Sequence, residues 1–480
     1  MSSKTHFSYG AGFRSLTREI AEPVRLTVQG ELQTWLQGAL LRTGPSKFEV
    51  GARLYNHWFD GLAMLHRFAF AQGEVSYSNR FLQSNAFTAA ERTGKISYGE
   101  FATDPCRTLF GRIAAIFDPK LTDNCCVNVS AYGGKITAFT ETSLPLRFAP
   151  ETLETLGVFD YGDALKGQIS TAHPHCDSAR ACHYNYIADL GRSSVYRLIG
   201  IGGDGSQRVV AEIPVERPAY MHSFAMSEHH LVLTEFPLVV RPIDLRLSGR
   251  PFIENYRWEP ERGLVFHVIE KDTGRLVRTA ATDAAFAFHH VNAFEDAEGL
   301  LVDVIVYPDA TIIDALYLAR LRAGAPLDVT GQLTRYRVPL SRNGPVTRKT
   351  LAPVPLELPR INYETHAGKP YRFVWGTGIE VRGDFLDSIV RIDTETGEVS
   401  RWHEAGLYPG EPVFVPAPSA RAENDGVLLS VVLDAASGGS FLLVLDAATL
   451  KEKARAETPH AIPFHFHGNY FPTIPGATSR

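Results

Sequence analysis

The chain has 480 residues and a formal net charge of −5 at neutral pH. That charge argues against a nucleic-acid partner, which normally meets a basic stripe, and no RNA- or DNA-binding motif is recognisable. No apolar run of about 18 residues occurs, so the sequence predicts no membrane-spanning helix. The first residues, Met1-Ser-Ser-Lys-Thr-His6, also lack the apolar core of a secretion signal.

Cysteine usage and the absence of linkers indicate the compartment and the domain organisation. The five cysteines include an adjacent pair, Cys125 and Cys126, and without an export signal they predict reduced thiols in the cytoplasm. Length alone allows about three domains. Because no Ser/Gly-rich linker or low-complexity segment marks a boundary, we expect residues 1–480 to form one domain, with residues 1–30 as an N-terminal extension. No obligate protein partner is predicted.

The N-terminal third contains two candidate helices. Apolar residues at helical spacing predict a short helix at Glu31–Leu41, ending before a turn at Gly44-Pro45. Phe48–Phe70 has the pattern of strand and loop. Asp104–Phe117 predicts an amphipathic helix, and its pattern alone favours an ordinary helix packed on the core. The candidate membrane-contact patch on this helix comprises Cys106, Leu109, Phe110, Ile113, Ile116 and Phe117.

From about Val127 the chain reads as a succession of strands. Turns such as Lys271-Asp-Thr-Gly274 separate them and suit antiparallel hairpins. The predicted strands are Val127–Val129, Lys135–Phe139, Val195–Ile201, Val209–Ile213, His230–Glu235, Leu264–Glu270, Leu300–Val306, Ile389–Asp393, Val427–Leu433 and Phe441–Asp446. Only Asp314–Arg322 predicts another helix. Hairpins without helical crossovers favour a propeller or a large sandwich, and no fixed repeat period decides between them.

Four segments place histidines among apolar residues. One such histidine is usually a hydrogen-bonded core residue, whereas four in one chain favour metal binding. The segments are Thr171–Asp177, Tyr220–Phe224, Phe286–Phe294 and Ala461–Phe471. In the last segment His465 and His467 alternate, and in a strand both would face the same way. On ligand softness alone, Fe(II), Zn(II) and Cu(II) all suit four neutral imidazoles.

Two alternatives compete with a shared histidine centre. Cys176, Cys182 and His183 offer a local zinc site, although their spacing matches none of the usual Cys-x-x-Cys pairs. A non-catalytic propeller that binds partner proteins through one face is the other alternative. That alternative gives no reason for four histidines flanked by apolar residues.

Several separated motifs, in the right order, resemble the carotenoid cleavage oxygenase family. They are the four histidine segments with Asn56–Gly61, Glu141–Pro145, Gly368–Arg372, Gly410–Pro416 and Asp425–Val431. The resemblance covers the chain from about Glu31 to Tyr470. It implies an all-β fold, namely a seven-bladed β-propeller with a cap of loops and short helices on one face and iron on the axis.

The resemblance also assigns roles to individual residues. It implies that Fe(II) is held by His173, His222, His289 and His467. His289 is chosen over His290 because it directly follows Phe288, and His467 over His465 because Gly468 follows it. The residues implied to support or surround the iron are Glu141, Glu357, Glu411, Thr140, Phe59, Tyr307 and Trp258. The glutamates would support three of the histidines, Thr140 would shape access of O2, and the aromatic residues would line a substrate tunnel.

The implied activity is oxidative cleavage of a conjugated C=C bond in a carotenoid or apocarotenoid by O2. Relatives that cleave stilbenes commonly carry a lysine directly before the first supporting glutamate. Here that position is Thr140 and the nearest lysine is Lys135, which favours a polyene over a stilbene or other phenylpropenoid. The family also contains isomerases. The resemblance further implies that Asp104–Phe117 rests on a membrane surface, making the protein a peripheral membrane protein.

Overall fold

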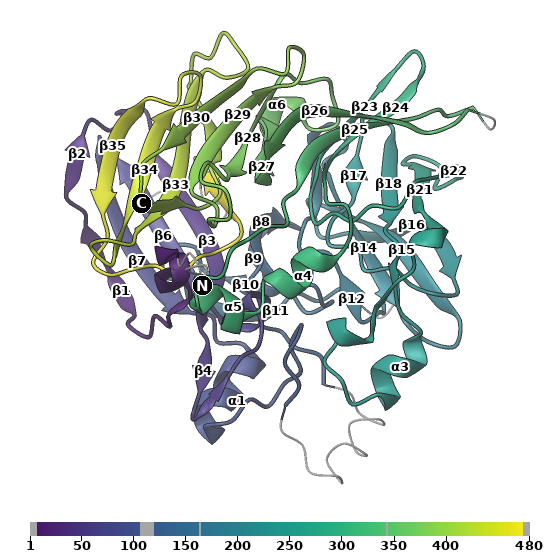
Figure 1. Ribbon diagram of the computed structural model, residues 1–480, viewed down its shortest axis with the longest axis horizontal. Coiled ribbons are helices and arrows are strands. Elements are labelled where there is room, and N and C mark those ends of the chain that lie inside the picture. Colours follow the sequence, from purple (N-terminus) through teal and green to yellow (C-terminus); the bar gives the residue numbers. More distant parts are fainter. Residues whose placement is uncertain (1–6, 106–119, 163–164, 342–343, 474–480) are drawn as a thin grey trace, which may run out of the picture.

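Seven antiparallel sheets are arranged around a central axis and form a seven-bladed β-propeller (Figure 1). The computed structural model describes residues 7–105, 120–162, 165–341 and 344–473. In most blades the chain runs from the innermost strand outward through hairpins, which explains the regular alternation of strands and turns. Neighbouring blades meet through their innermost strands, for example β17 with β23 and β32 with β36.

The blades are numbered in the order in which the chain completes their hairpins, and their strands are given from the axis outward. Blade 1 contains β36 (Gly468–Phe471), β3 (Gly38–Lys47), β6 (Leu62–Ala71), β7 (Glu74–Phe81) and β1 (Ile20–Arg25). Blade 2 contains β8 (Asn128–Tyr132), β9 (Lys135–Phe139), β10 (Leu146–Phe148) and β11 (Thr155–Val158). Blade 3 contains β12 (Ile169–Ser170), β14 (Cys182–Asp189), β15 (Ser194–Gly202) and β16 (Gln207–Val215), with β13 (His175–Asp177) also paired to β14.

The remaining blades follow the same plan. Blade 4 contains β17 (Ala225–Met226), β18 (His230–Glu235), β21 (Leu264–Glu270) and β22 (Leu276–Thr282). Blade 5 contains β23 (His290–Asp296), β24 (Gly299–Val306), β25 (Gln332–Val338) and β26 (Thr347–Pro355). Blade 6 contains β27 (Glu357–Arg360), β28 (Phe373–Gly378), β29 (Ser388–Asp393) and β30 (Val399–His403). Blade 7 contains β31 (Leu407–Pro409), β32 (Val413–Pro416), β33 (Gly426–Asp434), β34 (Gly439–Asp446), β35 (Glu452–Glu457) and β2 (Val28–Gly30).

Two strand pairs close the ring by joining distant parts of the sequence. β36, near the C-terminus, pairs with β3 in the register Arg42↔Gly468 and Leu40↔Tyr470. β2, near the N-terminus, pairs with β35. Because β1 and β2 belong to blades, the expectation of residues 1–30 as an extension is corrected over this part of the segment.

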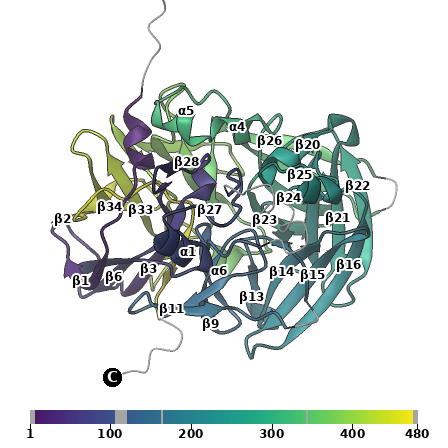
Figure 2. The ribbon, with the colours of Figure 1, turned by 90° about the horizontal axis from the view of Figure 1, so that it is seen from below.

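Short helices, 3-10 turns and two small ribbons lie outside the blade strands, mostly in the connections between them. Figure 2 shows α4 and α5 side by side on one side of the blades. The helices are α1 (Asn85–Thr93), α3 (Pro242–Leu247), α4 (Thr311–Ala315), α5 (Leu318–Arg322) and α6 (Tyr363–His366), with 3-10 turns η1 (Ser8–Phe13), η2 (Trp58–Asp60), η3 (Ser178–Arg180), η4 (Ile253–Asn255) and η5 (Pro260–Arg262). The ribbons are β4 (Glu49–Val50) with β5 (Arg53–Leu54), and β19 (Leu238–Val239) with β20 (Arg257–Trp258). No helix in the described ranges is long and apolar enough to cross a membrane.

Local sequence explains most of the strands. All the predicted strands coincide with a strand of a blade, apart from one to three residues at their ends, and β9, β18 and β21 have the predicted bounds. Burial alternates along most of β21, whereas β18 and β33 are buried at nearly every position because both faces of these strands are covered. The turn before β22 needs Gly274, whose φ of 69° places it in the left-handed region.

The two helix predictions that fall on described residues are wrong in part. Glu31–Leu41 is not helical, because Leu40 and Leu41 lie in β3 between two partner strands. The Gly44-Pro45 turn is instead a continuation of β3, and Pro45 lies at a register shift that tolerates its missing N–H. Asp314–Arg322 is divided into α4 and α5, since Tyr317 is extended and forms a bridge with His57. The proposed membrane helix lies outside the described residues from position 106 to 119.

Candidate metal centre

Four histidines from four blades meet on the propeller axis. His222 precedes β17, His289 precedes β23 and His467 precedes β36, while His173 follows β12. Their candidate ligand nitrogens all lie within 4.8 Å of one another. Among the described residues, this is the only group of histidine, cysteine and acidic side chains close enough to hold a metal ion. Three of the imidazoles are buried and His173 is partly buried.

The facing ring nitrogens are placed so that a cation could bind between them. His289 Nε2 and His467 Nε2 are 3.0 Å apart, and so are His173 Nε2 and His222 Nε2. His289 and His467 each direct Nδ1 at a carboxylate, which keeps the proton on Nδ1 and leaves a lone pair on Nε2. Two lone pairs at that distance repel each other, whereas a metal ion satisfies both. The donor set therefore fits a bound metal.

Three glutamates each contact the Nδ1 atom of one of the histidines. Glu141 Oε1 lies 2.6 Å from His222 Nδ1, and Glu357 Oε2 lies 2.6 Å from His289 Nδ1. Glu411 Oε1 lies 2.7 Å from His467 Nδ1. Such contacts fix the tautomer and the ring direction of a metal-ligating histidine. His173 contacts none of the three carboxylates.

Tyrosine hydroxyl groups hold two of these carboxylates in place. Tyr220 Oη donates to Glu141 over 2.8 Å, and Tyr307 Oη donates to Glu357 over 2.8 Å. Burial alone would raise the pKa of Glu357, but contact with His289 and further hydrogen bonds lower it below the ordinary value. The carboxylate is therefore charged when it meets the imidazole.

Glu411 is held by two arginines and a backbone donor. Its carboxylate lies 3.7 Å from Arg42 and 3.2 Å from Arg360, and the N–H of Gly468 donates to Oε2 over 3.0 Å. Burial raises the pKa of Glu411 and lowers that of Arg42 to about 10. Both groups are almost completely enclosed, so each depends on the other for its charge to be tolerated.

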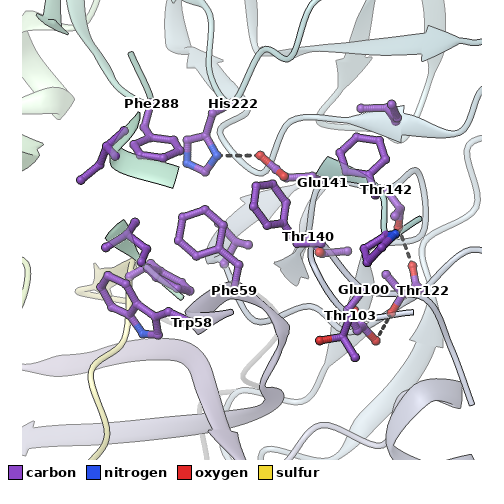
Figure 3. Close-up of a pocket in the computed structure, with 18 of the residues that line it drawn as sticks. Trp58, Phe59, Glu100, Thr103, Thr122, Thr140, Glu141, Thr142, His222 and Phe288 are labelled. Carbon is purple, nitrogen blue, oxygen red and sulfur yellow. Dashed lines mark hydrogen bonds and ion pairs between the residues drawn. The ribbon is translucent and has the colours of Figure 1, made fainter. Parts of the chain in front are cut away.

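A cavity of about 460 Å³ opens onto the histidines. Its lining includes Phe59, Thr140, Phe288 and Tyr307. Figure 3 shows Phe59 and Phe288 beside His222, with Thr140 next to Glu141 on the same wall. Phe288 and Phe466 directly precede two of the histidines, so a Phe-His pair supplies both a candidate ligand and a wall of the cavity.

Several candidate residues lie away from this centre. His290 faces the other side of its strand and contacts Ser223 Oγ and Thr234 Oγ1. His465 contacts Ser46 Oγ, and its segment is an unpaired extended stretch, since β36 begins only at Gly468. Trp258 does not line the cavity, because β20 pairs it with Leu238 in a small ribbon.

The local zinc alternative finds no support in the described residues. Cys176 lies opposite His183 and Asp177 opposite Cys182 in the β13–β14 pair, with Cys176 exposed and Cys182 buried. Neighbouring side chains on one strand point to opposite faces of a sheet. Cys182 and His183 therefore cannot both approach the ion that Cys176 would bind.

Sequence reasoning missed some functional positions. Tyr220, Arg42 and Arg360 contact the supporting glutamates, although they lie far from them in the sequence. Only Tyr220 carried a signal, because it lies two residues before His222 in a segment already singled out. The arginines lie on strands whose patterns are ordinary.

Comparisons with known proteins agree with this geometry. A family model described as retinal pigment epithelial membrane protein matches residues 13–472. The carotenoid isomerooxygenase of Galleria mellonella is 35% identical over 96% of each chain. The chain belongs to the carotenoid cleavage oxygenase family. The β,β-carotene 15,15'-dioxygenase of Gallus gallus, another carotenoid oxygenase, is 33% identical over 96% of this chain and 98% of its own.

Solved structures of carotenoid oxygenases share the fold. A cobalt-substituted apocarotenoid oxygenase from Synechocystis superposes with a TM-score of 0.87 at 26% identity, covering 97% of this chain and 98% of that chain. A chimera of that oxygenase and the retinal pigment epithelial protein gives a TM-score of 0.87 at 26% identity, over 98% of this chain. The present chain thus shares the propeller fold of these relatives over nearly its whole length.

Proposed function

We propose that this carotenoid oxygenase is an Fe(II)-dependent dioxygenase. It cleaves one conjugated C=C bond of a carotenoid or apocarotenoid, and the two oxygen atoms of O2 become the oxygens of two carbonyl products. The observation that carries the proposal is the convergence of four imidazoles at the wall of an aromatic cavity, with a carboxylate behind each of three.

His173, His222, His289 and His467 would hold the iron. An all-imidazole set departs from the usual two-histidine, one-carboxylate iron site, and imidazole is a good ligand for iron. Bound Fe(II) supplies the redox chemistry that lets O2 react with a double bond. Glu141, Glu357 and Glu411 keep the ring protons at Nδ1, so the opposite nitrogens remain free to coordinate.

The cavity walls position the polyene and exclude water. Phe59 packs at 5.7 Å from Phe288 and 4.9 Å from Phe466, measured between ring centroids. These rings give a flat conjugated chain apolar surfaces to lie against, which restricts the double bonds that can approach the histidines. Thr140 lies on the same wall and narrows the space open to O2.

A polyene suits this cavity better than a stilbene. Thr140 occupies the position at which stilbene-cleaving relatives commonly carry lysine. Lys135, at the far end of β9, is exposed and is not part of the cavity lining. Because threonine rather than lysine directly precedes Glu141, we assign the polyene as substrate.

We also propose that the protein is cytoplasmic and touches a membrane surface where the cavity opens. Ile243 and Leu247 of α3 are 48% and 61% exposed, and Leu245, Arg246 and Leu247 of the same helix line the cavity. Apolar and basic side chains together are typical of a surface that meets lipid. A substrate insoluble in water would then pass directly from the bilayer into the cavity.

Product analysis tests the proposed reaction. Protein loaded with Fe(II) is incubated in air with β-carotene, a long apocarotenal and resveratrol, and the aldehydes are identified by mass. We expect cleavage of at least one polyene, with 18O from labelled O2 in both fragments. His222→Ala removes one candidate ligand, so it should abolish the products and lower the bound iron.

Other outcomes would reject specific parts of the proposal. Cleavage of resveratrol alone would replace the polyene by a stilbene. An isomerised or hydrolysed polyene without incorporation of 18O would replace the oxygenase by an isomerase. A protein that carries stoichiometric zinc, forms no product and behaves like its His222→Ala variant would support the non-catalytic propeller instead.

A further inference from the structure

A row of aromatic rings belongs to the lining of the cavity. Phe385 lies 5.6 Å from Trp58, and Trp58 lies 4.4 Å from Phe466, between ring centroids. Phe466 lies 4.9 Å from Phe59, which in turn lies 5.1 Å from Phe101. Phe385 and Phe101 are the two terminal rings of this row, and Phe59 and Phe466 lie between them beside the histidines.

The two ends differ in polarity. Around Phe385 the lining is largely apolar and includes Leu316, Leu327, Ile379 and Leu386. Around Phe101 the lining is rich in polar groups, namely Glu100, Thr103, Thr122, Thr142, Lys120 and Arg250. Glu100, Thr103 and Thr122 of this second group are buried, and a pure hydrocarbon offers them no polar partner.

Glu100 is the buried acid of the polar end. Its residue exposure is 6%, and its side chain is part of the cavity wall. Thr122 Oγ1 donates to Glu100 Oε1 over 2.8 Å. The side chain of Asn124 also lies close enough to act on this carboxyl group. Figure 3 places Glu100, Thr103 and Thr122 together, on the side of Thr140 away from His222.

The nearby threonines have already used their hydroxyl protons. Thr103 Oγ1 donates to Asp60, Thr122 Oγ1 to Glu100 and Thr142 Oγ1 to the carbonyl of Thr122. A hydroxyl has one proton to donate. Glu100 is therefore the buried residue of this group that retains a donor for a ligand, provided that its carboxyl group is protonated.

The surroundings keep Glu100 protonated. Burial, reinforced by the nearby carboxylates of Asp60 and Asp123, raises the pKa of Glu100 well above its ordinary value, although the Thr122 hydrogen bond acts in the opposite direction. A neutral carboxylic acid donates through its O–H. Beside the buried Glu100, the same carboxylates disfavour an anionic ligand end, whereas Lys120 and Arg250 of this lining are exposed to solvent.

We propose that Glu100 donates a hydrogen bond to an uncharged oxygen at one end of the substrate. The cavity then selects apocarotenoids with a terminal carbonyl or hydroxyl group over hydrocarbon carotenoids. The hydrocarbon portion extends past the histidines toward Phe385. This inference rests on the proposed polyene-cleaving function and adds to it the class of substrate end and the residue that recognises it.

Variants of Glu100 test this selection in the iron-loaded protein. Glu100→Leu removes the donor, Glu100→Gln keeps a neutral N–H donor, and Glu100→Asp withdraws the acid by one methylene. Glu298→Gln, at a carboxylate that is 75% exposed, is the matched control. We expect Glu100→Leu and Glu100→Asp to lower kcat/KM about tenfold for a long apocarotenal and its alcohol, mainly through KM. Glu100→Gln and Glu298→Gln should leave kcat/KM for the apocarotenal and its alcohol almost unchanged. None of the variants should change the activity on β-carotene much.

Absorption spectra supply a readout that needs no turnover. Apocarotenal is bound without O2, and a hydrogen bond to its carbonyl shifts the polyene band to longer wavelength, because excitation moves negative charge onto the oxygen. Wild type and Glu100→Gln should show the shift, and Glu100→Leu and Glu100→Asp should lack it. If the band of the bound apocarotenal is shifted in Glu100→Leu and Glu100→Asp as it is in wild type, the role of Glu100 is overturned. The same holds if these two variants keep the wild-type preference between the aldehyde and β-carotene. A donor-dependent shift in a protein that cleaves no polyene would refute the proposed function and leave the binding site standing.

Discussion

At the residue scale, His57 shows how a buried imidazole organises the cavity wall. His57 is fully buried, and both of its ring nitrogens have partners. Nε2–H donates to the carbonyl of Ile313 over 3.0 Å, and Nδ1 accepts from the N–H of Phe59 over 3.1 Å. Asp60 completes the turn by accepting from the N–H of His57 over 2.9 Å. A neutral His57 thus fixes the backbone that carries Phe59.

Acid should therefore weaken the fold through His57. Burial, opposed by the Ile313 hydrogen bond, lowers the pKa of His57 to about 3, whereas an unfolded histidine titrates near pH 6.5. Between these values the unfolded chain binds the additional proton. The stability due to neutral His57 is complete above about pH 6.5 and falls by about 1.4 kcal/mol per pH unit below it.

Urea unfolding of wild type and His57→Asn across this pH range measures the effect. The difference in unfolding free energy should be largest above about pH 6.5 and shrink as the pH falls toward about 5.5. His229→Asn, at an exposed imidazole, is the control and should run parallel to wild type. Parallel profiles for wild type and His57→Asn would contradict the assigned tautomer and burial.

At the scale of elements, β36 places His467 and closes the ring. Gly468 is the first residue of β36 and lies opposite Arg42 of β3. A Cβ at Gly468 would lie 2.5 Å from the carbonyl oxygen of Leu41 and collide with the Arg42 side chain. The N–H of Gly468 also donates to Glu411. Close backbone approach therefore explains glycine directly after His467.

Gly468→Ala should have two effects at once: it should destabilise the protein, and it should displace His467. We expect a loss of about 2 kcal/mol in unfolding free energy, because the added methyl meets backbone that is held by pairing on both sides. Metal affinity should fall with it, as measured by iron titration. Gly191→Ala is the matched control, since no atom lies within 4 Å of its added methyl. Full stability of Gly468→Ala would show that β3 and β36 are not packed as described.

At the scale of the whole molecule, the histidines tie together blades that are distant in sequence. His467 belongs to blade 1, while His173, His222 and His289 belong to blades 3, 4 and 5. An ion held by all four stabilises only the closed ring, because the unfolded chain cannot bring them together. A seven-bladed ring closed by β36 and β2 also depends on strand pairing between the two ends of the chain.

Removal of the metal should lower the stability of the entire propeller. At free metal about a thousandfold above Kd, binding contributes about 4 kcal/mol, and a chelator removes that contribution. The denaturation midpoint should fall on chelation and recover when Fe(II) is added. His467→Ala binds metal weakly, so chelation should shift its midpoint much less. An equal shift in wild type and His467→Ala would place the stabilising metal elsewhere.

The sequence by itself determined the strands and the histidines of the centre. Alternating, β-branched segments such as Leu264–Glu270 form strands because their burial pattern matches a pleated surface on which both neighbours are also strands. The histidine segments could be found because apolar flanks mark them as buried. Their resemblance to a known family, rather than spacing, selected four of them and the supporting glutamates.

Only the tertiary structure decided the features that depend on contacts distant in sequence. Helical spacing at Glu31–Leu41 yielded to strand pairing, because β3 gains partners from both ends of the chain. His465 and His467 share their local pattern, yet one contacts Ser46 and the other joins the centre. The raised pKa of the Glu100 carboxyl group likewise depends on the burial and the nearby charges that the folded chain supplies. Local sequence specifies propensity and chemistry, whereas packing specifies which groups meet.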